Sequence, residues 1–403
     1  MSFDVATLRG HFPALRSGVA HFDGPGGTQT PRPVGDAIAA TLTGPLSNRG
    51  LAVAPESNAE LAVAQFREAY ADLLGVVSDA VVYGRSATQI TYDMSRALAK
   101  QWRSGDEVVV TRLDHDCNVR PWVQAAGVAG ALVRWIDFDP ETSEIDMNSV
   151  RSAISERTRL VAVTAASNLI GTKPPVSAIA DAAHAAGALL YVDGVHYSAH
   201  QFVDVGALGA DLYVCSPYKV LGPHCGVLAA ASPDLLETVW PDKLLPSTDA
   251  VPERFELGTL PYEVMAGATA AVDFVAGIAP GDAGDRRARV RASLHAVEEH
   301  ELRLRRVLEA GLAEFGSAVV NHSRAADRTP TLLLTLPGRR TWDAYEFLAG
   351  RDVLAPAGSF YAYEAFRRLG LDDQHGLRLG VAPYTDDTDV ARVLDGLTAF
   401  LRR

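Results

Sequence analysis

Short apolar runs alternate with helical segments through the middle of the chain, and this alternation constrains the fold more than any other feature. The runs cover residues 81–83, 107–110, 131–135, 160–164, 189–192 and 212–215. Helices are expected over residues 59–74, 122–130 and 176–186, and another ends near Ala99, because apolar residues recur there at helical spacing. Strands and helices that alternate in this way predict an α/β fold. Its sheet would be mostly parallel and doubly wound, with helices on both faces.

The pattern changes near a glycine-rich stretch at residues 277–284. Beyond it, the sequence predicts a long charged helix over residues 289–311, a strand over 331–336 and a final helix from Asp387. We therefore expect a second, smaller α+β domain. The predicted divisions are an N-terminal arm of residues 1–25 that joins the small domain, a large domain of residues 26–280, and a small C-terminal domain of residues 281–403.

Composition places the chain among ordinary globular proteins. Its 403 residues, 48% of them hydrophobic and 21% charged, are enough for two domains with a substantial core. A formal net charge of -12 without a basic stripe argues against nucleic-acid binding. The three cysteines are too few for a disulfide framework and fit a reducing compartment. No apolar run is long enough to span a bilayer, and residues 1–10 lack the apolar segment of a signal peptide. We expect a soluble, cytoplasmic protein without nucleic-acid or membrane partners.

An aspartate and a lysine stand just after two of the expected strands. Asp193 follows residues 189–192, and Lys219 follows residues 212–215 in the sequence Ser-Pro-Tyr-Lys. This placement suits pyridoxal phosphate, because the amine forms a Schiff base with the cofactor aldehyde and the carboxylate keeps the pyridine nitrogen protonated. Most basic residues of the chain are arginines, which cannot form an imine, so this lysine is more informative than usual. A surface lysine and an ion-paired or helix-capping aspartate are the plainer alternatives.

Other polar residues follow neighbouring strands, and ligands gather at the carboxyl ends of parallel strands. Ser86 opens a helix, where free amides and a hydroxyl hold phosphate. His115 is placed to stack on the pyridine ring and shuttle protons, and Asn168 to bind the phenolic oxygen or a substrate carboxylate. The guanidinium of Arg378 suits an α-carboxylate. Each residue also has a structural interpretation, as a helix cap, a loop histidine, a turn asparagine or an edge-strand arginine.

Two other kinds of site compete with this interpretation. His196 and His200 lie four residues apart near Asp193, as in a hydrolytic metal site, but no glutamate stands where a general base is required. The glycines at residues 24–27 precede no clear helix, and no Gly-x-Gly-x-x-Gly follows a strand, which disfavours a nicotinamide cofactor. The sequence therefore favours pyridoxal phosphate over a metal or a nicotinamide.

Taken together, these residues resemble a known family over nearly the whole chain. The chain is similar to the class V aminotransferase family of fold-type I pyridoxal phosphate enzymes, and within it to the cysteine-desulfurase-like branch. The matching segments cover residues 21–25, 118–122, 193–196, 216–223, 254–259 and 381–385. The resemblance implies an enzyme that acts on an amino acid as a homodimer, with active sites built from both subunits.

The resemblance also implies which residues hold the cofactor. Lys219 would be the Schiff-base lysine, Asp193 the partner of the pyridine nitrogen and His115 the stacking residue. His196 stands where the family usually has a glutamine near the phenolic oxygen. The full implied set is Ser86, Ala87, His115, Asn168, Asp193, His196, Ser216, Lys219 and Thr259, with Ser86, Ala87 and Ser216 on the phosphate and Thr259 reaching the phosphate of the neighbouring subunit.

A second implied set contacts the substrate. Asn168 and Arg378 would face its carboxylate, and Arg49 would enter the pocket of the neighbouring subunit. Tyr361 is expected at the substrate as well, since it occupies the place of the catalytic cysteine of desulfurases in residues 357–362. Tyr218 is a further departure, because desulfurases usually have a histidine before the lysine.

The missing cysteine decides between reactions. Cys117, Cys215 and Cys225 all lie outside the C-terminal region, so persulfide formation lacks its nucleophile. The leading hypothesis is therefore C–S β-elimination from a cysteine S-conjugate, with release of a thiol, pyruvate and ammonia. Transamination is the runner-up. Decarboxylation, epimerisation and true cysteine desulfuration remain open, whereas a non-catalytic regulator is disfavoured because Lys219 and Asp193 are present and no helix-turn-helix is evident.

Overall fold

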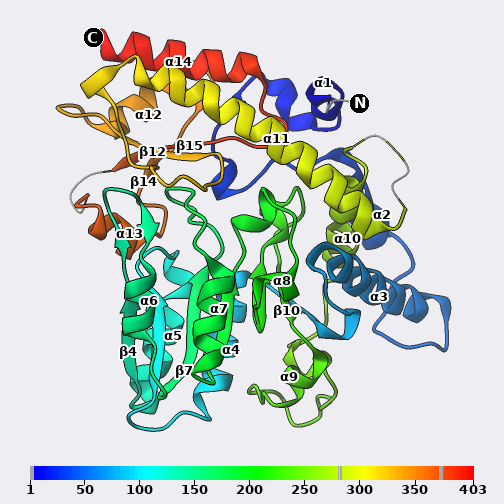
Figure 1. The fold of residues 1–403 in the computed structure, drawn as a ribbon. Coiled ribbons are helices and arrows are strands. Elements are labelled where there is room, and N and C mark those ends of the chain that lie inside the picture. Colours follow the sequence, from blue (N-terminus) through cyan, green and yellow to red (C-terminus); the bar gives the residue numbers. More distant parts are fainter. Residues whose placement is uncertain (1–3, 280, 282–283, 372–374) are drawn as a thin grey trace.

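Two sheets organise the chain in a computed structural model, which describes residues 4–279, 281, 284–371 and 375–403 (Figure 1). The larger sheet has seven strands in the order β2-β10-β9-β8-β7-β3-β4. Their bounds are β2 (Val81–Gly84), β3 (Glu107–Thr111), β4 (Leu132–Ile136), β7 (Thr158–Thr164), β8 (Leu189–Asp193), β9 (Leu212–Cys215) and β10 (Gly226–Ala230). Adjacent strands are parallel except for β10, which runs antiparallel to β2 and β9. The predicted α/β fold with a mostly parallel sheet is confirmed. Within this sheet, β10 is the strand that was not predicted from the sequence.

Helices cover both faces of this sheet because alternate residues of each strand point to opposite sides. Val108 and Val110 of β3 pack with helices α4 (Ala87–Ala99) and α5 (Arg120–Ala129). Val109, between them, belongs to the core on the other face. The helices of that core include α3 (Ala54–Leu74), α7 (Val176–Ala185) and α10 (Tyr262–Ala276).

The smaller sheet has four strands in the order β11-β12-β15-β14, all antiparallel. They are β11 (Val320–Asn321), β12 (Thr331–Thr335), β14 (Ala357–Gly358) and β15 (Gly376–Gly380). Helices α12 (Thr341–Ala349) and α14 (Asp387–Leu401) share its apolar core. The strand and the final helix predicted beyond residue 284 are therefore present.

Helix α11 (Arg286–Ala313) connects the two cores and runs above both in Figure 1. Val290 and Leu294 pack in the core of the large sheet, whereas Leu304 and Leu308 pack against the small one. The N-terminal segment joins the small domain: β1 (Ala20–His21) pairs with β13 (Val353–Leu354) in a separate two-stranded sheet, and Ala20 and Phe22 belong to the apolar core of the small sheet. The domain limits stay predictions: residues 1–3 of the expected arm and residue 280 at the expected boundary lie outside the described residues.

Two further observations concern the helices. Helix α3 begins at Ala54 rather than near residue 59, because Pro55 fits the first turn of a helix. None of the described helices has the length and apolar character needed to cross a bilayer; the expected cytoplasmic location stays a prediction. The remaining bounds are α1 (Val5–Arg9), α2 (Arg32–Thr43), β5 (Phe138–Asp139), β6 (Glu144–Ile145), α6 (Met147–Ala153), α8 (Val205–Leu208), α9 (Pro233–Glu237) and α13 (Tyr363–Arg368).

Candidate active site

Most of the predicted site residues line one cavity of about 80 Å³ at the carboxyl ends of the parallel strands. Asp193 is the last residue of β8, and Ser216 follows β9 directly. The predicted residues in its wall are Ser86, Ala87, His115, Asn168, Asp193, His196, Ser216 and Lys219. Residues far apart in sequence therefore meet where the parallel sheet places the ends of its strands.

One end of the cavity is the start of helix α4. Ser86 caps this helix, and its hydroxyl accepts a hydrogen bond from the Gln89 amide at 3.1 Å. The backbone of β10 lies directly against this turn: a Cβ on Gly226 would stand 2.5 Å from the Ser86 carbonyl carbon and 2.7 Å from the Ala87 nitrogen. A helix start with free amides suits a phosphate, and Gly226 allows the strand to approach it.

Lys219 and Asp193 are both buried in the cavity, with exposed fractions of 6% and 3%. The Val195 amide donates to Asp193 Oδ1 at 2.9 Å. The thiol of Cys117 lies 3.7 Å from Asp193 Oδ2. One carboxylate oxygen thus has a backbone donor, and the other faces the cavity beside a weak donor.

Burial controls the protonation of these groups. Burial, reinforced by the nearby Arg378 cation and opposed by Asp193, lowers the pKa of Lys219 to about 8. Burial also raises the pKa of Asp193, although the Val195 amide and Lys219 oppose this rise. An amine with such a pKa is a usable base near neutral pH, because an appreciable fraction is unprotonated.

His115 lies over the same cavity as a neutral imidazole. Its pKa falls to about 3, first through burial and then through the cations of Lys219 and Arg378. The Cys117 amide donates to His115 Nδ1 at 3.1 Å, which leaves the ring proton on Nε2. The neutral ring of His115 is therefore suited to stacking on a cofactor. It is less suited to donating a proton as an imidazolium would.

A second, wider cavity of about 800 Å³ opens beside Lys219 and His115. Arg378 and Asn168 line it, and Arg378 Nη1 donates to the Asn168 carbonyl at 3.0 Å. Among the described atoms, Arg378 Nε and Asn168 Oδ1 are buried without a hydrogen-bond partner. Burial lowers the pKa of Arg378 to about 9. A buried guanidinium with a spare donor matches the carboxylate expected there.

His196 sits at the base of the first cavity and contacts the smaller sheet. Its Nε2 lies 3.0 Å from the Thr329 hydroxyl and 3.1 Å from the Thr331 hydroxyl. Its Nδ1 is buried and has no hydrogen-bond partner among the described residues. Behind it, His200 forms a buried pair with Glu301, with 2.7 Å between Nδ1 and Oε2.

The competing metal site is not formed by these residues. Within the ranges that the structure covers, no three histidine, cysteine, aspartate or glutamate side chains are grouped as metal ligands. His200 is instead engaged by Glu301.

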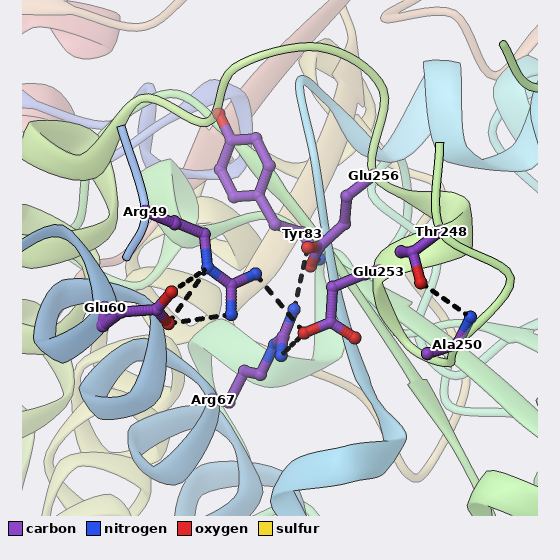
Figure 2. Close-up of polar contacts among 8 residues, drawn as sticks. All are labelled: Arg49, Glu60, Arg67, Tyr83, Thr248, Ala250, Glu253 and Glu256. Atoms are coloured by element: carbon purple, nitrogen blue, oxygen red, sulfur yellow. Dashed lines mark hydrogen bonds and ion pairs between the residues drawn. The ribbon is translucent and has the colours of Figure 1, made fainter. Parts of the chain in front are cut away.

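Two predicted residues lie away from the lysine cavity of their own chain. Figure 2 shows Arg49 paired with Glu60 and Glu253, at 2.9 Å and 3.3 Å. The neighbouring Arg67 contacts Glu253 and Glu256. Thr259 lines a separate cavity of about 520 Å³. Their expected roles in a neighbouring subunit stay predictions.

Sequence reasoning missed several residues of the cavity walls. Thr88, Cys117, Thr164 and Tyr218 all line the first cavity. Thr164 ends β7 as Asp193 ends β8, so its position at a strand end was an available signal. Tyr218 was noted only as a departure, yet its ring stacks on His224 with 4.9 Å between centroids.

The cavity residues fit pyridoxal phosphate by their chemistry. Lys219 offers an amine to an aldehyde and Asp193 a carboxylate to a pyridine nitrogen. The unpartnered Nδ1 of His196 offers a hydrogen-bonding atom for the phenolic oxygen, and the start of α4 offers amides for a phosphate. Each polar part of the cofactor therefore has a matching group.

Comparisons with known proteins show which family the chain belongs to. The profile of the family described as aminotransferase class-V matches residues 20–393. The aminotransferase-like protein FGM3 of Gibberella zeae is 29% identical over 99% of both chains. A probable cysteine desulfurase of Vibrio cholerae is 30% identical over 74% of this chain and 77% of its own. The crystal structure of the cysteine desulfurase CsdA from Escherichia coli has a TM-score of 0.87 at 24% identity, covering 100% of this chain and 99% of that one.

Proposed function

Because the chain belongs to the class-V aminotransferase family of pyridoxal phosphate-dependent enzymes, we propose that it cleaves cysteine S-conjugates by C–S β-elimination. The products would be a thiol, pyruvate and ammonia, with one water consumed. The observation that carries the proposal is a cavity with matching groups for the cofactor but without a usable thiolate beside the substrate. Tyr361, which by the resemblance takes the place of the desulfurase cysteine, lines the wider cavity.

The three cysteines of the chain support this choice. Cys215 and Cys225 are buried in the apolar core, with exposed fractions of 0% and 1%. Cys117 lines the cofactor cavity, but burial, strengthened by Asp193, raises its pKa well above the usual value. A protonated thiol is a poor nucleophile, so persulfide chemistry is not favoured at any of the three.

The residues of the chain would have the following roles in this reaction. Arg378 and Asn168 bind the α-carboxylate and orient the α-carbon toward Lys219. The Lys219 amine takes the α-proton, and its pKa of about 8 leaves it both available and basic at neutral pH. Asp193 keeps the ring nitrogen protonated, and His115 packs on the ring face. When bound, the cofactor supplies an electron sink for the electrons released at the α-carbon.

The test is an assay of thiol and pyruvate release from a series of cysteine S-conjugates. We expect equal amounts of both products from the holoenzyme and none from Lys219→Arg, which keeps the positive charge but cannot form an imine. Lys173→Arg is the matched control and should retain full activity, because Lys173 pairs with Asp327 and lies outside both cavity walls. Absence of turnover across varied conjugates contradicts the proposal.

Transamination is a second candidate, because the same Lys219 can return the proton to the cofactor and because FGM3 carries an aminotransferase-like description. It predicts dependence on a keto acid and no thiol release. The name of the relative from Vibrio cholerae points to desulfuration as a third possibility. That reaction predicts alanine formation from free cysteine, with sulfur retained on Cys117 as the one thiol at the cavity.

We also propose that the enzyme works as a homodimer with composite sites. Arg49 and Thr259 do not reach the Lys219 cavity of their own chain, so the contacts expected of them require a second copy. Mixing Lys219→Ala with Arg49→Ala chains tests this, since a mixed dimer would contain one intact site. We expect activity to return on mixing and subunit exchange. No recovery, with both variants dimeric, contradicts shared sites.

A further inference from the structure

The turn after β14 carries two adjacent aromatic residues in a rarely occupied backbone conformation. Phe360 and Tyr361 have φ angles of 55° and 57°. Bulky side chains disfavour this left-handed region, and residues persist there only when the surrounding structure holds them. Two in succession at the mouth of the candidate active site indicate a turn that is fixed by its contacts.

Hydrogen bonds from the opposite side of the cavity hold this turn. Asn168 Nδ2 donates to the Phe360 carbonyl at 3.0 Å. The Asp116 amide donates to the Tyr361 carbonyl at 2.7 Å. Both donors come from loops of the large sheet, whereas the turn follows a strand of the small one. These hydrogen bonds therefore connect the turn of the small domain to the large domain across the site.

Each ring of the turn faces a residue of the site. The guanidinium carbon of Arg378 lies 3.8 Å from the centre of the Phe360 ring. The Tyr361 ring lies 5.5 Å from the His115 ring at an angle of 32°. Phe360 thus covers the group expected to bind the substrate carboxylate. Tyr361, with 76% of its surface exposed, leaves a ring face available to a ligand.

The wider cavity is lined by Lys219, Tyr361, Tyr92 and Gln124, among other residues. Its volume of about 800 Å³ falls within the range of about 300–1,000 Å³ that holds drug-sized ligands, far more than a cysteine side chain requires. Apart from Lys219, His115 and Arg378 of the site itself, the described basic side chain that lines this cavity is Arg120, which is already paired with Asp116 at 2.8 Å and with Glu364. Arg49, expected from a neighbouring subunit, is likewise paired with Glu60 and Glu253. The surfaces offered to a substrate side chain are therefore aromatic rings and an amide, not an uncompensated charge.

We infer that the Phe360–Tyr361 turn is a fixed aromatic clamp that selects substrates with a planar, uncharged group beyond the β-carbon. The inference rests on the proposed function, because it places that group on the sulfur of a cysteine S-conjugate. Phe360 positions Arg378 for the α-carboxylate, while Tyr361 packs against the planar group. Offset aromatic contacts of this kind favour a planar ring over a saturated group of similar size.

Binding of two unreactive amino acids to the holoenzyme tests the clamp. L-Homophenylalanine carries a planar ring at the position of an S-phenyl group, L-homocyclohexylalanine carries a saturated ring of similar size there, and neither can release a thiol. Their dissociation constants come from the change in cofactor absorption on titration. We expect homophenylalanine to bind about tenfold more tightly, which corresponds to about 1.4 kcal/mol. Tyr361→Ala should abolish this preference by weakening homophenylalanine more than the cyclohexyl ligand, and Tyr361→Phe should retain it.

Tyr363→Ala is the matched control, because Tyr363 is a half-exposed tyrosine outside the wall of the wider cavity. It should keep the tenfold preference. Equal binding of the two ligands, no spectral change with homophenylalanine, or a preference that survives in Tyr361→Ala overturns the clamp. If the preference is present but no thiol is ever released from S-phenylcysteine, the proposed reaction is wrong and the clamp stands.

Discussion

Replacing Lys219 with methionine is expected to stabilise the cofactor-free protein. Lys219 is 6% exposed, and its pKa falls from an ordinary 10.5 to about 8, mainly through burial. Below about pH 8 the amine is protonated in both the folded and the unfolded chain. The folded state therefore carries the cost of a buried cation, which methionine, a side chain of similar length, removes.

The size of this effect follows from the two pKa values. Each unit between them is worth 1.36 kcal/mol, so the gap between 8 and 10.5 gives a gain of about 3 kcal/mol in the free energy of unfolding. The folded-state pKa of Lys219 lies below its unfolded value, so the charged amine destabilises the folded protein, whereas a lysine in an ion pair usually stabilises it. The gain is fully present below about pH 8, declines as the pH rises toward 10.5, and vanishes above it, where the wild-type amine is neutral in both states.

Urea unfolding of the cofactor-free wild type and Lys219→Met, at equal protein concentration and between about pH 6 and pH 10, measures the difference. Subtracting the two curves removes the other groups that titrate in this range. Lys100→Met is the control, since the Lys100 side chain is 45% exposed and loses little hydration on folding, and we expect a much smaller gain in stability for it. A variant less stable than wild type at neutral pH, or a gain that does not change up to pH 10, refutes the reasoning.

Three other substitutions test separate parts of the site. Asp193→Asn should lower turnover by about two orders of magnitude or more while the cofactor still binds, because an amide cannot keep the ring nitrogen protonated; unchanged turnover contradicts this role. Gly226→Ala places a Cβ 2.5 Å from the Ser86 carbonyl carbon and should weaken cofactor retention in equilibrium dialysis; full retention would show that the turn yields. Glu301→Leu leaves His200 without its partner in a buried site and should cost about 1–3 kcal/mol in urea unfolding, whereas no measurable loss argues against a tight pair.

The sequence was sufficient to predict which residues meet at the strand ends, whereas their roles stay predictions. Asp193 ends a strand, Ser86 and His115 follow strands, and the carboxyl ends of parallel strands share one edge. Their convergence therefore needed only the alternation of apolar runs and helices. Lys219 could be placed by the same rule because it follows β9.

Features that depend on tertiary contacts were not predictable in this way. β10 (Gly226–Ala230) consists of small and aliphatic residues, which do not distinguish a strand from a helix, and it pairs antiparallel between β2 and β9. The conformation of Phe360 and Tyr361 is imposed by donors far away in sequence, such as Asn168. No local propensity predicts two aromatic residues in the left-handed region.

The charge balance of the site predicts that an amino acid binds better than a simple amine. Lys219 and Arg378 are buried basic groups, Asp193 is the carboxylate that opposes Lys219, and His115 is neutral, first because it is buried and then because both cations disfavour its protonation. Burial is the main cause of the lowered pKa values of about 8 and 9, so each positive charge is costly in the cavity until an anion lies beside it. A phosphate at the start of α4 and a carboxylate at Arg378 supply the missing negative charge. An amine that lacks the carboxylate leaves Arg378 uncompensated, so it should bind much more weakly than the corresponding amino acid.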